Sequence, residues 1–357
     1  MRGRMGRRET SRRPFVYSPV MPFIMRPRAS RRAALFTILG VVVIACAARS
    51  RGAPPRLRVW GFTVPWEARS SAVAREHAGQ LDAVISGWIQ LDSLTGQPFA
   101  EFRDTLARNR TGGLRLMGIV TNAVGGRFHA DPVRQLVADP SALGRAAGAV
   151  ARRLTTGGYR GVVIDLEGFA PTDRAVATAA IHAIADSARA RGVRPIAVAV
   201  PAVDTMVFNG RDLVPAADYL LVMLYDQHWM TSPPGPLAAP DWVRGATALR
   251  VGEVGAQHVV AALPLYGYRW PTSGPAAALT FADAQRDAAA ANVTLQRDPA
   301  TSTMRATTPG VWDLWVSDAG LIDTLIRQVR AQGVNTIALW RLGQEDPDVW
   351  ETVSRAR

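Results

Sequence analysis

Short apolar runs alternate with helix-like segments along most of this 357-residue chain. The helical pattern is clearest at residues 173–191, where apolar side chains recur on one face and Gly192 follows as a stop signal. The runs themselves are apolar on both faces, which is typical of parallel strands between helices. Eight such runs are present, at residues 57–64, 83–91, 114–120, 161–167, 195–200, 219–225, 259–265 and 336–340.

Eight strand and helix units predict an α/β fold, a (β/α)₈ TIM barrel, over residues 55–357. Residues 268–318 are too long for an ordinary connection, so they predict a small α+β insertion between the seventh strand and the last helices. No repeat or low-complexity linker divides residues 55–357, which predicts one domain there. In such barrels the catalytic groups lie at the carboxyl ends of the strands.

The positive charge of the chain is concentrated at its start. Of 42 basic residues, all arginine, and 29 acidic residues, twelve arginines and one acid lie in residues 1–51, so the remainder carries an excess of only two. A nucleic-acid-binding domain normally shows a basic stripe within its folded part, so no nucleic-acid partner is predicted. Because the chain has no lysine, Schiff-base chemistry, pyridoxal phosphate attachment and a Walker P-loop are excluded.

Residues 1–51 also carry a pattern that predicts export. An uncharged stretch, residues 33–48, follows a basic run and precedes Arg49, which is the order of a signal peptide, and it is too short for a comfortable membrane span. The single cysteine, Cys46, closes this stretch in a segment that resembles a bacterial lipobox, with an ordinary buried cysteine as the alternative. We expect a secreted or cell-envelope protein that contacts the membrane only through its signal or a lipid at Cys46.

Two carboxylates, Asp165 and Glu167, end the fourth predicted strand. Side chains alternate along a strand, so both lie on one face, roughly 6.6 Å apart along the strand. At that separation, with little water, both cannot ionise cheaply, and one should keep its proton near neutral pH. Glycosidic cleavage needs such a group, because the leaving oxygen must accept a proton from a general acid. Pairing of both acids with arginines is the alternative.

The segment from Gly161 to Glu167 resembles the strand-four signature of glycoside hydrolase family 18, the chitinase-like barrels, which in full reads Asp-Gly-x-Asp-x-Asp-x-Glu. Residues 225–229, Tyr-Asp-Gln-His-Trp, are similar to the branch that contains spore-cortex-lytic and related envelope N-acetylglucosaminidases. Further segments match the family in barrel order: residues 223–226, 263–268, and Trp340 with residues 342–346.

This resemblance implies a role for each matching residue. Glu167 is expected to act as general acid and then as base, and Asp165 to orient the 2-acetamido group of the substrate. Tyr225 and Asp226 are expected to hydrogen-bond that group, whose oxygen is the nucleophile in this family, so that configuration is retained. Trp340 is expected to form the floor under the same sugar, because an indole matches the apolar face of a sugar ring.

Four further residues are expected to bind substrate. Met223 belongs to the Met-x-Tyr-Asp element, and Asn122 follows the third strand, where the cortex-lytic branch also has Thr-Asn. Trp60 and Trp229 stand near predicted strand ends and are candidate sugar platforms.

Two positions depart from the family signature. Arg160 stands where many members have the first aspartate, and Val163 stands where the second aspartate or an asparagine is usual. We expect the pKa of Asp165 to be set by Glu167 and Tyr225 instead of by a neighbour at position 163.

The sequence as a whole predicts an exported, monomeric glycosidase that cleaves β-linked N-acetylglucosamine-containing glycans such as peptidoglycan, chitin-like chains or poly-N-acetylglucosamine. No cofactor or metal is expected, because the five histidines form no metal-ligand spacing and neither Gly-x-Ser-x-Gly nor Gly-x-Gly-x-x-Gly occurs. A non-catalytic glycan-binding barrel and a polysaccharide-export accessory are the alternatives. Glu167, which binding-only relatives usually lose, favours the enzyme.

Overall fold

Eight parallel strands form a closed ring in the computed structural model, which describes residues 55–109 and 113–357. Strand β1 pairs with β2 on one side and with β16 on the other, and this pairing closes the barrel. The barrel strands in ring order are β1 Arg58–Phe62, β2 Ala83–Leu91, β4 Leu116–Thr121, β7 Gly161–Asp165, β8 Ile196–Pro201, β9 Tyr219–Met223, β10 Val259–Pro264 and β16 Thr336–Trp340.

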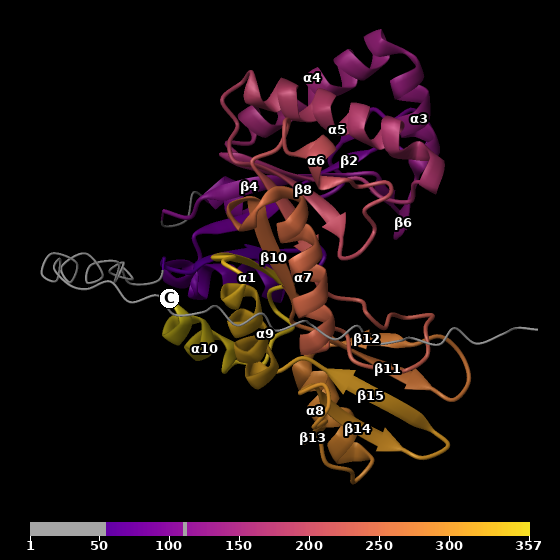
Figure 1. Ribbon diagram of the computed structural model, residues 1–357, viewed down its shortest axis with the longest axis vertical. Helices are drawn as coiled ribbons and strands as arrows, with labels where there is room; N and C mark the ends of the chain where they lie inside the picture. The colour runs from indigo at the N-terminus through magenta and orange to yellow at the C-terminus, as the bar shows by residue number, and fades with distance from the viewer. Residues whose placement is uncertain (1–54, 110–112) are drawn as a thin grey trace, which may run out of the picture. The chain divides into compact units, whose positions relative to one another are not determined.

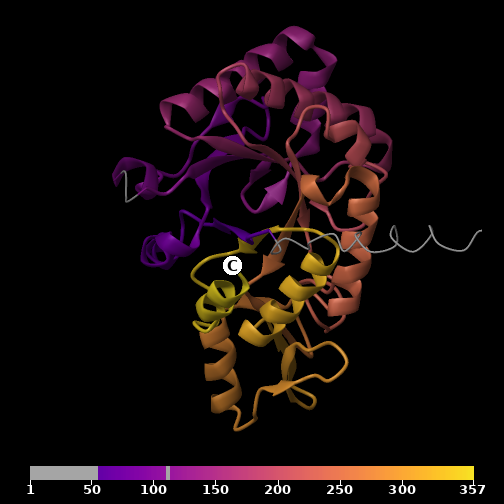
Figure 2. The same cartoon turned by 60° about the vertical axis from the view of Figure 1, so that its left-hand side comes forward.

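Helices follow the strands and cover the outside of the barrel (Figures 1 and 2). They form where apolar residues recur on one face, as in α5 Arg174–Arg189, whose buried residues include Ala177, Ile181 and Ile184. The others are α1 Ala68–Glu76, α2 Thr105–Asn109, α3 Ala130–Ala138, α4 Pro140–Thr156, α6 Gly210–Leu213, α7 Pro240–Val254, α9 Ala319–Ala331 and α10 Val349–Ala356, with 3-10 turns at Ala78–Gln80, Pro171–Asp173 and Ala256–His258.

An antiparallel sheet and one helix form an insertion between β10 and α9 (Figure 1). The strand order of this sheet is β12-β11-β15-β14-β13. Its helix α8 begins with a capping box, in which Thr280 and Asp283 satisfy each other's backbone N–H groups. The elements are β11 Gly267–Pro271, β12 Ala277–Leu279, α8 Phe281–Ala290, β13 Gln296–Arg297, β14 Met304–Thr308 and β15 Trp312–Val316.

A short strand and a hairpin extend from the carboxyl ends of two barrel strands. Strand β3, Pro98–Phe99, extends the main sheet beyond β2 as an antiparallel partner. After β4 the chain forms a hairpin of β5, Ala123–Val124, and β6, Arg127–Phe128. This hairpin lies next to the candidate site described below.

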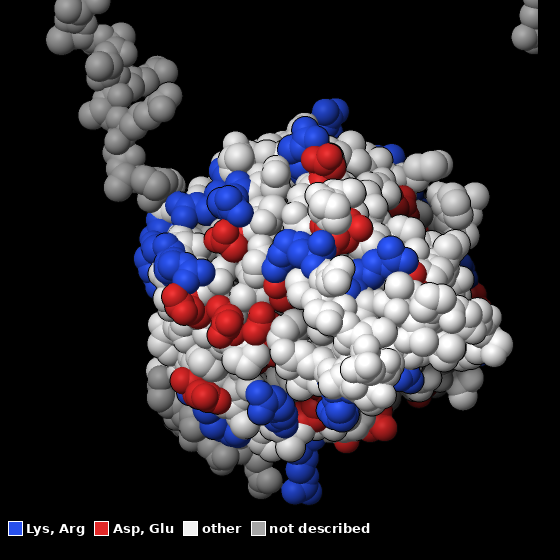
Figure 3. Space-filling view, turned by 90° about the horizontal axis from the view of Figure 1, so that it is seen from below, with Lys and Arg blue, Asp and Glu red and all other residues white. Residues whose placement is uncertain are grey.

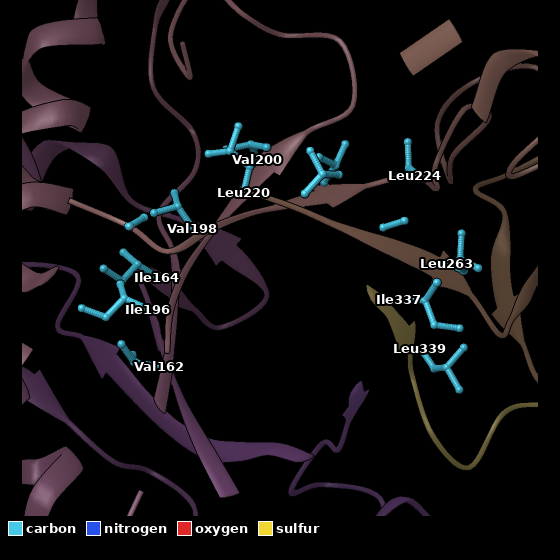
Figure 4. Packing of buried hydrophobic residues seen from close by; sticks show 14 of the residues in the cluster. Val162, Ile164, Ile196, Val198, Val200, Leu220, Leu224, Leu263, Ile337 and Leu339 are labelled. Atoms are coloured by element: carbon cyan, nitrogen blue, oxygen red, sulfur yellow. The ribbon is translucent and has the colours of Figure 1, made fainter. Parts of the chain in front are cut away.

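Alternation along the strands separates two apolar layers. Residues such as Val162 and Ile164 point out toward the helices, where Figure 4 shows them with Val198 and Leu220 in the larger core. Their neighbour Val163 points into the barrel, where it packs in a second cluster. Each fully buried side chain of this size contributes roughly 1.5–3 kcal/mol of transfer free energy. The same alternation sends Asp165 inward.

The predicted fold class, a (β/α)₈ barrel with an α+β insertion, is confirmed. Two of the predicted strands, 83–91 and 336–340, have the observed bounds. The predicted strands 161–167 and 219–225 end two residues earlier, at Asp165 and Met223, because the chain leaves the ladder at the mouth of the barrel.

Charged side chains of both signs lie on the face shown in Figure 3. Several arginines form ion pairs, such as Arg305 with Asp313. Within residues 55–109 and 113–357, no helix has both the length and the apolar character needed to cross a membrane. The predicted signal segment and Cys46 lie outside the described residues.

Candidate active site

A cavity of about 450 Å³ opens at the carboxyl ends of the barrel strands. Strands β7, β9 and β16 end at its wall, so the residues that finish these strands face one another across it. Six of the residues expected in the site line this cavity: Asp165, Glu167, Met223, Tyr225, Asp226 and Trp340.

Asp165 and Glu167 form the acidic part of the cavity. Burial raises the pKa of Glu167, and the negative charges of Asp165 and Asp226 raise it further. Burial also raises the pKa of Asp165, although its interactions with Glu167 and Thr121 oppose that effect. Glu167 has the higher pKa of the two, so it holds the proton at neutral pH while Asp165 is the first to ionise.

Asp165 carries an unsatisfied acceptor. Its Oδ1 atom is buried and accepts no hydrogen bond from any residue in 55–109 or 113–357. A buried carboxylate oxygen without a donor is costly, so a substrate N–H group placed there would be bound favourably.

Two tyrosines that follow β10, the seventh barrel strand, hold Asp226. The Tyr266 hydroxyl donates to Asp226 Oδ1, and the Tyr268 hydroxyl donates to the same atom at 3.3 Å. Asp226 has a positive φ of 56°, a left-handed conformation that aspartate tolerates better than most residues. Burial raises the pKa of Asp226 and these two hydroxyls lower it. Sequence reasoning assigned no role to Tyr266 or Tyr268; their Tyr-Gly-Tyr spacing after a strand was the available signal.

Aromatic rings form the opposite wall. Tyr225 lies parallel to Trp340, with ring centroids 6.0 Å apart and an interplanar angle of 12°. Phe62 meets Trp340 edge-on at 5.1 Å. Trp340 lines the cavity, so its indole offers a flat apolar surface next to the acidic groups.

The structure corrects two of the expected substrate contacts. Trp60 is 4% exposed and packs edge-on against Tyr219, the first residue of β9, so it lies toward the amino-terminal end of the barrel and away from the cavity. Asn122 is 1% exposed, and its side-chain amide donates hydrogen bonds to the backbone carbonyls of His129 and Glu167. Neither side chain is available to a sugar. Trp60 was expected near a strand end, but it stands in the middle of β1.

Trp229 lies apart from the cavity lining. The Trp229 residue is 49% exposed to solvent, and its indole N–H donates to Thr231 Oγ1 at 2.8 Å. The role of Trp229 as a sugar platform therefore stays a prediction.

The two departures from the family signature lie in different places. Val163 is fully buried among Met117, Ile119 and Ala197, so an apolar floor replaces a polar neighbour beneath Asp165. Arg160 precedes the first residue of β7, at the opposite end of the strand from Glu167. Only the change at position 163 reaches the cavity.

Among residues 55–109 and 113–357, no group of three or more His, Cys, Asp or Glu side chains is arranged to hold a metal ion.

Fold and site together define a class. The chain forms a closed (β/α)₈ barrel, and one cavity at its mouth is lined by a glutamate beside an aspartate, a Tyr-Asp pair and a tryptophan. This is the arrangement that the family 18 motifs imply. No family model matches the chain.

Curated relatives match parts of the chain. YdhD of Bacillus subtilis, assigned as a sporulation-specific glycosylase, is 30% identical over 159 residues, which are 43% of this chain and 38% of YdhD. The cortical fragment-lytic enzyme of Bacillus subtilis is 24% identical over 283 residues, which are 73% of this chain and 64% of that enzyme. The chain thus spans less than two thirds of either relative.

Solved structures share the fold over most of the chain. The spore cortex-lytic enzyme SleL of Bacillus cereus has a TM-score of 0.75 and 18% identity, covering 85% of this chain and 75% of SleL. A chitinase from Chromobacterium violaceum has a TM-score of 0.74 and 24% identity, covering 84% of this chain and 98% of the chitinase. These comparisons confirm the predicted similarity to family 18 barrels and to the cortex-lytic branch.

Proposed function

We propose that this protein is a glycoside hydrolase that cleaves β-linked N-acetylglucosamine-containing glycans with retention of configuration. One observation carries the proposal: Glu167 lines the same cavity as the Tyr225-Asp226 pair and the Trp340 indole. The pKa of Glu167 is raised by burial and by the neighbouring carboxylates. A general acid, polar groups for an acetamido substituent and a platform for a sugar ring are thereby supplied together.

In the first step the substrate's own acetamido oxygen attacks the anomeric carbon. The glycosidic carbon–oxygen bond breaks, its electron pair goes to the leaving oxygen, and that oxygen takes the proton of Glu167. Asp165, with its unsatisfied Oδ1 atom, accepts the acetamido N–H and balances the positive charge that develops on the ring formed by attack. Tyr225 and Asp226, the latter held by Tyr266 and Tyr268, hydrogen-bond the same acetamido group from the cavity wall.

In the second step Glu167 acts as a base. Water attacks the anomeric carbon, one water proton passes to the Glu167 carboxylate, and the acetamido oxygen leaves with the electron pair of the bond it had formed. The acid is then reset for another cycle. Because both attacks invert the anomeric carbon, the product retains the starting configuration.

The substrate class is supported by the names of the relatives, which include chitinases and cortex-lytic enzymes. We further propose that the protein acts as a monomer outside the cytoplasmic membrane, as a secreted protein or one anchored by lipid at Cys46. The glycans in question lie outside that membrane, and the charge pattern of residues 1–51 suits export.

Replacing Glu167 tests the proposal. Wild type and Glu167→Gln are compared on chito-oligosaccharides, a β-1,6-linked glucosamine polymer and peptidoglycan, with products followed by mass spectrometry and their anomeric form by proton NMR. We expect cleavage of at least one glycan with retained configuration, and a loss of at least about 100-fold in Glu167→Gln.

Glu351→Gln is the matched control, because Glu351 is exposed on α10 and pairs with nearby Arg355. It should leave activity unchanged. If wild type binds these glycans but cleaves none, the enzyme proposal is wrong and a glycan-binding barrel is the better reading.

A further inference from the structure

A side-chain amide lies where the backbone ladder between β4 and β7 stops. Thr121 and Asp165 are the last registered pair of these two strands. The residue that follows β4, Asn122, is 1% exposed, and the catalytic candidate Glu167 stands two residues beyond Asp165.

The Asn122 side-chain amide forms two hydrogen bonds with the backbone of Glu167. Its Oδ1 accepts from the Glu167 N–H at 2.9 Å, and its Nδ2 donates to the Glu167 carbonyl at 2.8 Å. A primary amide has the same donor and acceptor as a peptide group, so the side chain replaces the missing rung of the ladder. Glu167 therefore keeps the strand alternation that places it on the face of Asp165, although its backbone is outside β7.

The same amide holds the hairpin that follows β4. Asn122 Nδ2 also donates to the carbonyl of His129 at 3.0 Å, and the His129 N–H donates back to the Asn122 carbonyl at 3.0 Å. These bonds close the base of the β5–β6 hairpin, whose Phe128 is 41% exposed and lines the cavity. Both N–H groups of the amide are thus in use.

Gly168 allows the hairpin to approach the acid closely. It has a φ of 79°, and a Cβ atom there would lie 3.2 Å from Phe128 Cβ and 3.3 Å from the Phe128 carbonyl oxygen. Only glycine adopts this backbone conformation without strain while leaving that space free. The turn after Glu167 and the Phe128 hairpin are therefore packed as one unit.

This unit lies on the Glu167 side of the cavity. In the eight-stranded ring, β7 is four places from β16, so Glu167 stands across the barrel mouth from Trp340. If Trp340 holds the sugar that is attacked, the oxygen that Glu167 protonates belongs to the group beyond it. Phe128 belongs to the hairpin that follows β4, the strand next to β7, and it lines the cavity.

We infer that Asn122 is a positioning residue that holds Glu167 and the Phe128 hairpin in one arrangement, so that the proton is delivered to the leaving oxygen. This inference rests on the proposed function. It replaces direct substrate binding as the role of Asn122.

Leaving-group dependence tests the inference. Asn122→Ala and Asn122→Asp are assayed on a chito-oligosaccharide and on its 4-nitrophenyl glycoside, which departs with little help from an acid. We expect kcat on the oligosaccharide to fall by about 10- to 100-fold in Asn122→Ala with KM little changed, because small displacements of a catalytic group cost this much. On the nitrophenyl glycoside we expect a loss of less than about 3-fold.

Asn122→Asp separates the two kinds of hydrogen bond. Its carboxylate still accepts from the Glu167 N–H but cannot donate to the carbonyls of Glu167 and His129. Its added negative charge should also move the alkaline limb of the pH profile upward, since a nearby anion favours the protonated form of Glu167.

Asn335→Ala is the matched control, because Asn335 also donates to a backbone carbonyl, of Gly333 at 2.9 Å, but precedes β16 at the far end of the barrel. The ratio of the two rates is independent of the fraction of folded enzyme. An unchanged ratio in both Asn122 variants would overturn the inference, as would failure of both to fold while Asn335→Ala folds.

Hydrogen exchange gives a readout that needs no activity. Exchange of the Glu167 N–H, followed by mass spectrometry of peptides that span it, should become faster in Asn122→Ala and stay unchanged in Asn335→Ala. Unchanged exchange in Asn122→Ala would contradict the inference, whether or not wild type cleaves a glycan. Absence of cleavage by wild type, with faster exchange in Asn122→Ala, would contradict the proposed function alone.

Discussion

Two neighbouring carboxyl groups dominate the electrostatics of the site: Asp165, the last residue of β7, and Glu167, two residues beyond it. Asp165 and Glu167 are close enough, and buried enough, that their pKa values rise to different extents. The proposed mechanism requires Glu167 to be protonated and Asp165 to be ionised. It should therefore fall as pH drops through the pKa of Asp165, and fall again as pH rises through the higher pKa of Glu167.

Asp165→Asn should shift one limb of that profile. Loss of the Asp165 charge removes a cause of the raised pKa of Glu167, so the alkaline limb of kcat/KM should move to lower pH while overall activity decreases. Asp323→Asn, at the surface of α9 and paired with Arg327, should leave the limb in place. An alkaline limb that stays fixed in Asp165→Asn would show that another group sets it.

Val163→Asn should affect the other limb. An amide at position 163 would lie on the inward face next to Asp165 and could donate to its unsatisfied Oδ1, which lowers the pKa of Asp165 and moves the acid limb to lower pH. Burying the amide among apolar neighbours should cost roughly 1–3 kcal/mol of unfolding free energy. Val163→Ala is the control, because it also weakens the core but adds no donor, and its acid limb should not move.

Loops between elements shape the rest of the cavity, and one is held by a buried arginine. Arg250 of α7 is fully buried and donates to the carbonyls of Pro201 at 2.6 Å and Asp204 at 2.7 Å, and to that of Phe208 at 2.8 Å. It also pairs with Glu253 at 2.8 Å. The loop after β8, which includes cavity-lining Val203, is thereby tied to a helix.

Arg250→Ala should destabilise the barrel by roughly 3–5 kcal/mol, because it leaves buried carbonyls and Glu253 without their partner. Urea unfolding followed by circular dichroism measures the change. Arg244→Ala on the same helix removes an exposed pair with Asp241 and should cost less than about 1 kcal/mol. Equal losses in the two variants would show that the buried bonds add nothing specific.

At the scale of the whole molecule, charge is divided between two parts. The excess of arginine lies in residues 1–51, and the barrel that follows is nearly neutral, with acidic and basic side chains side by side on the face shown in Figure 3. A near-neutral barrel suits an uncharged or weakly charged glycan and gives no reason to expect nucleic-acid binding.

Processing of the first residues can be measured directly. In a bacterial host that exports the protein, we expect the mature chain to begin at Cys46 carrying lipid, because the uncharged stretch that precedes it resembles a lipobox. Mass spectrometry of the amino-terminal peptide gives the answer, and Cys46→Ser should lose the lipid mass. An unmodified start beyond Cys46 would exclude the anchor and leave a secreted protein.

The eight strands, the insertion and the identity of the acidic pair could be predicted from the amino-acid sequence. Strand alternation and the order of short motifs are properties of the chain, so Asp165 and Glu167 could be placed on one face before any packing was known. Strand ends were less certain, because residues 166–167 keep the alternation of a strand without being in the ladder.

Which side chains meet depends on the packing of the whole chain. Tyr266 and Tyr268 reach Asp226 from 40 and 42 residues away, Asn122 hydrogen-bonds the backbone of Glu167 instead of a substrate, and Trp60 faces the amino-terminal half of the barrel. These outcomes depend on the register between distant strands and on which face of each strand is buried. Neither is encoded in a local pattern, because register is set by packing across the whole barrel.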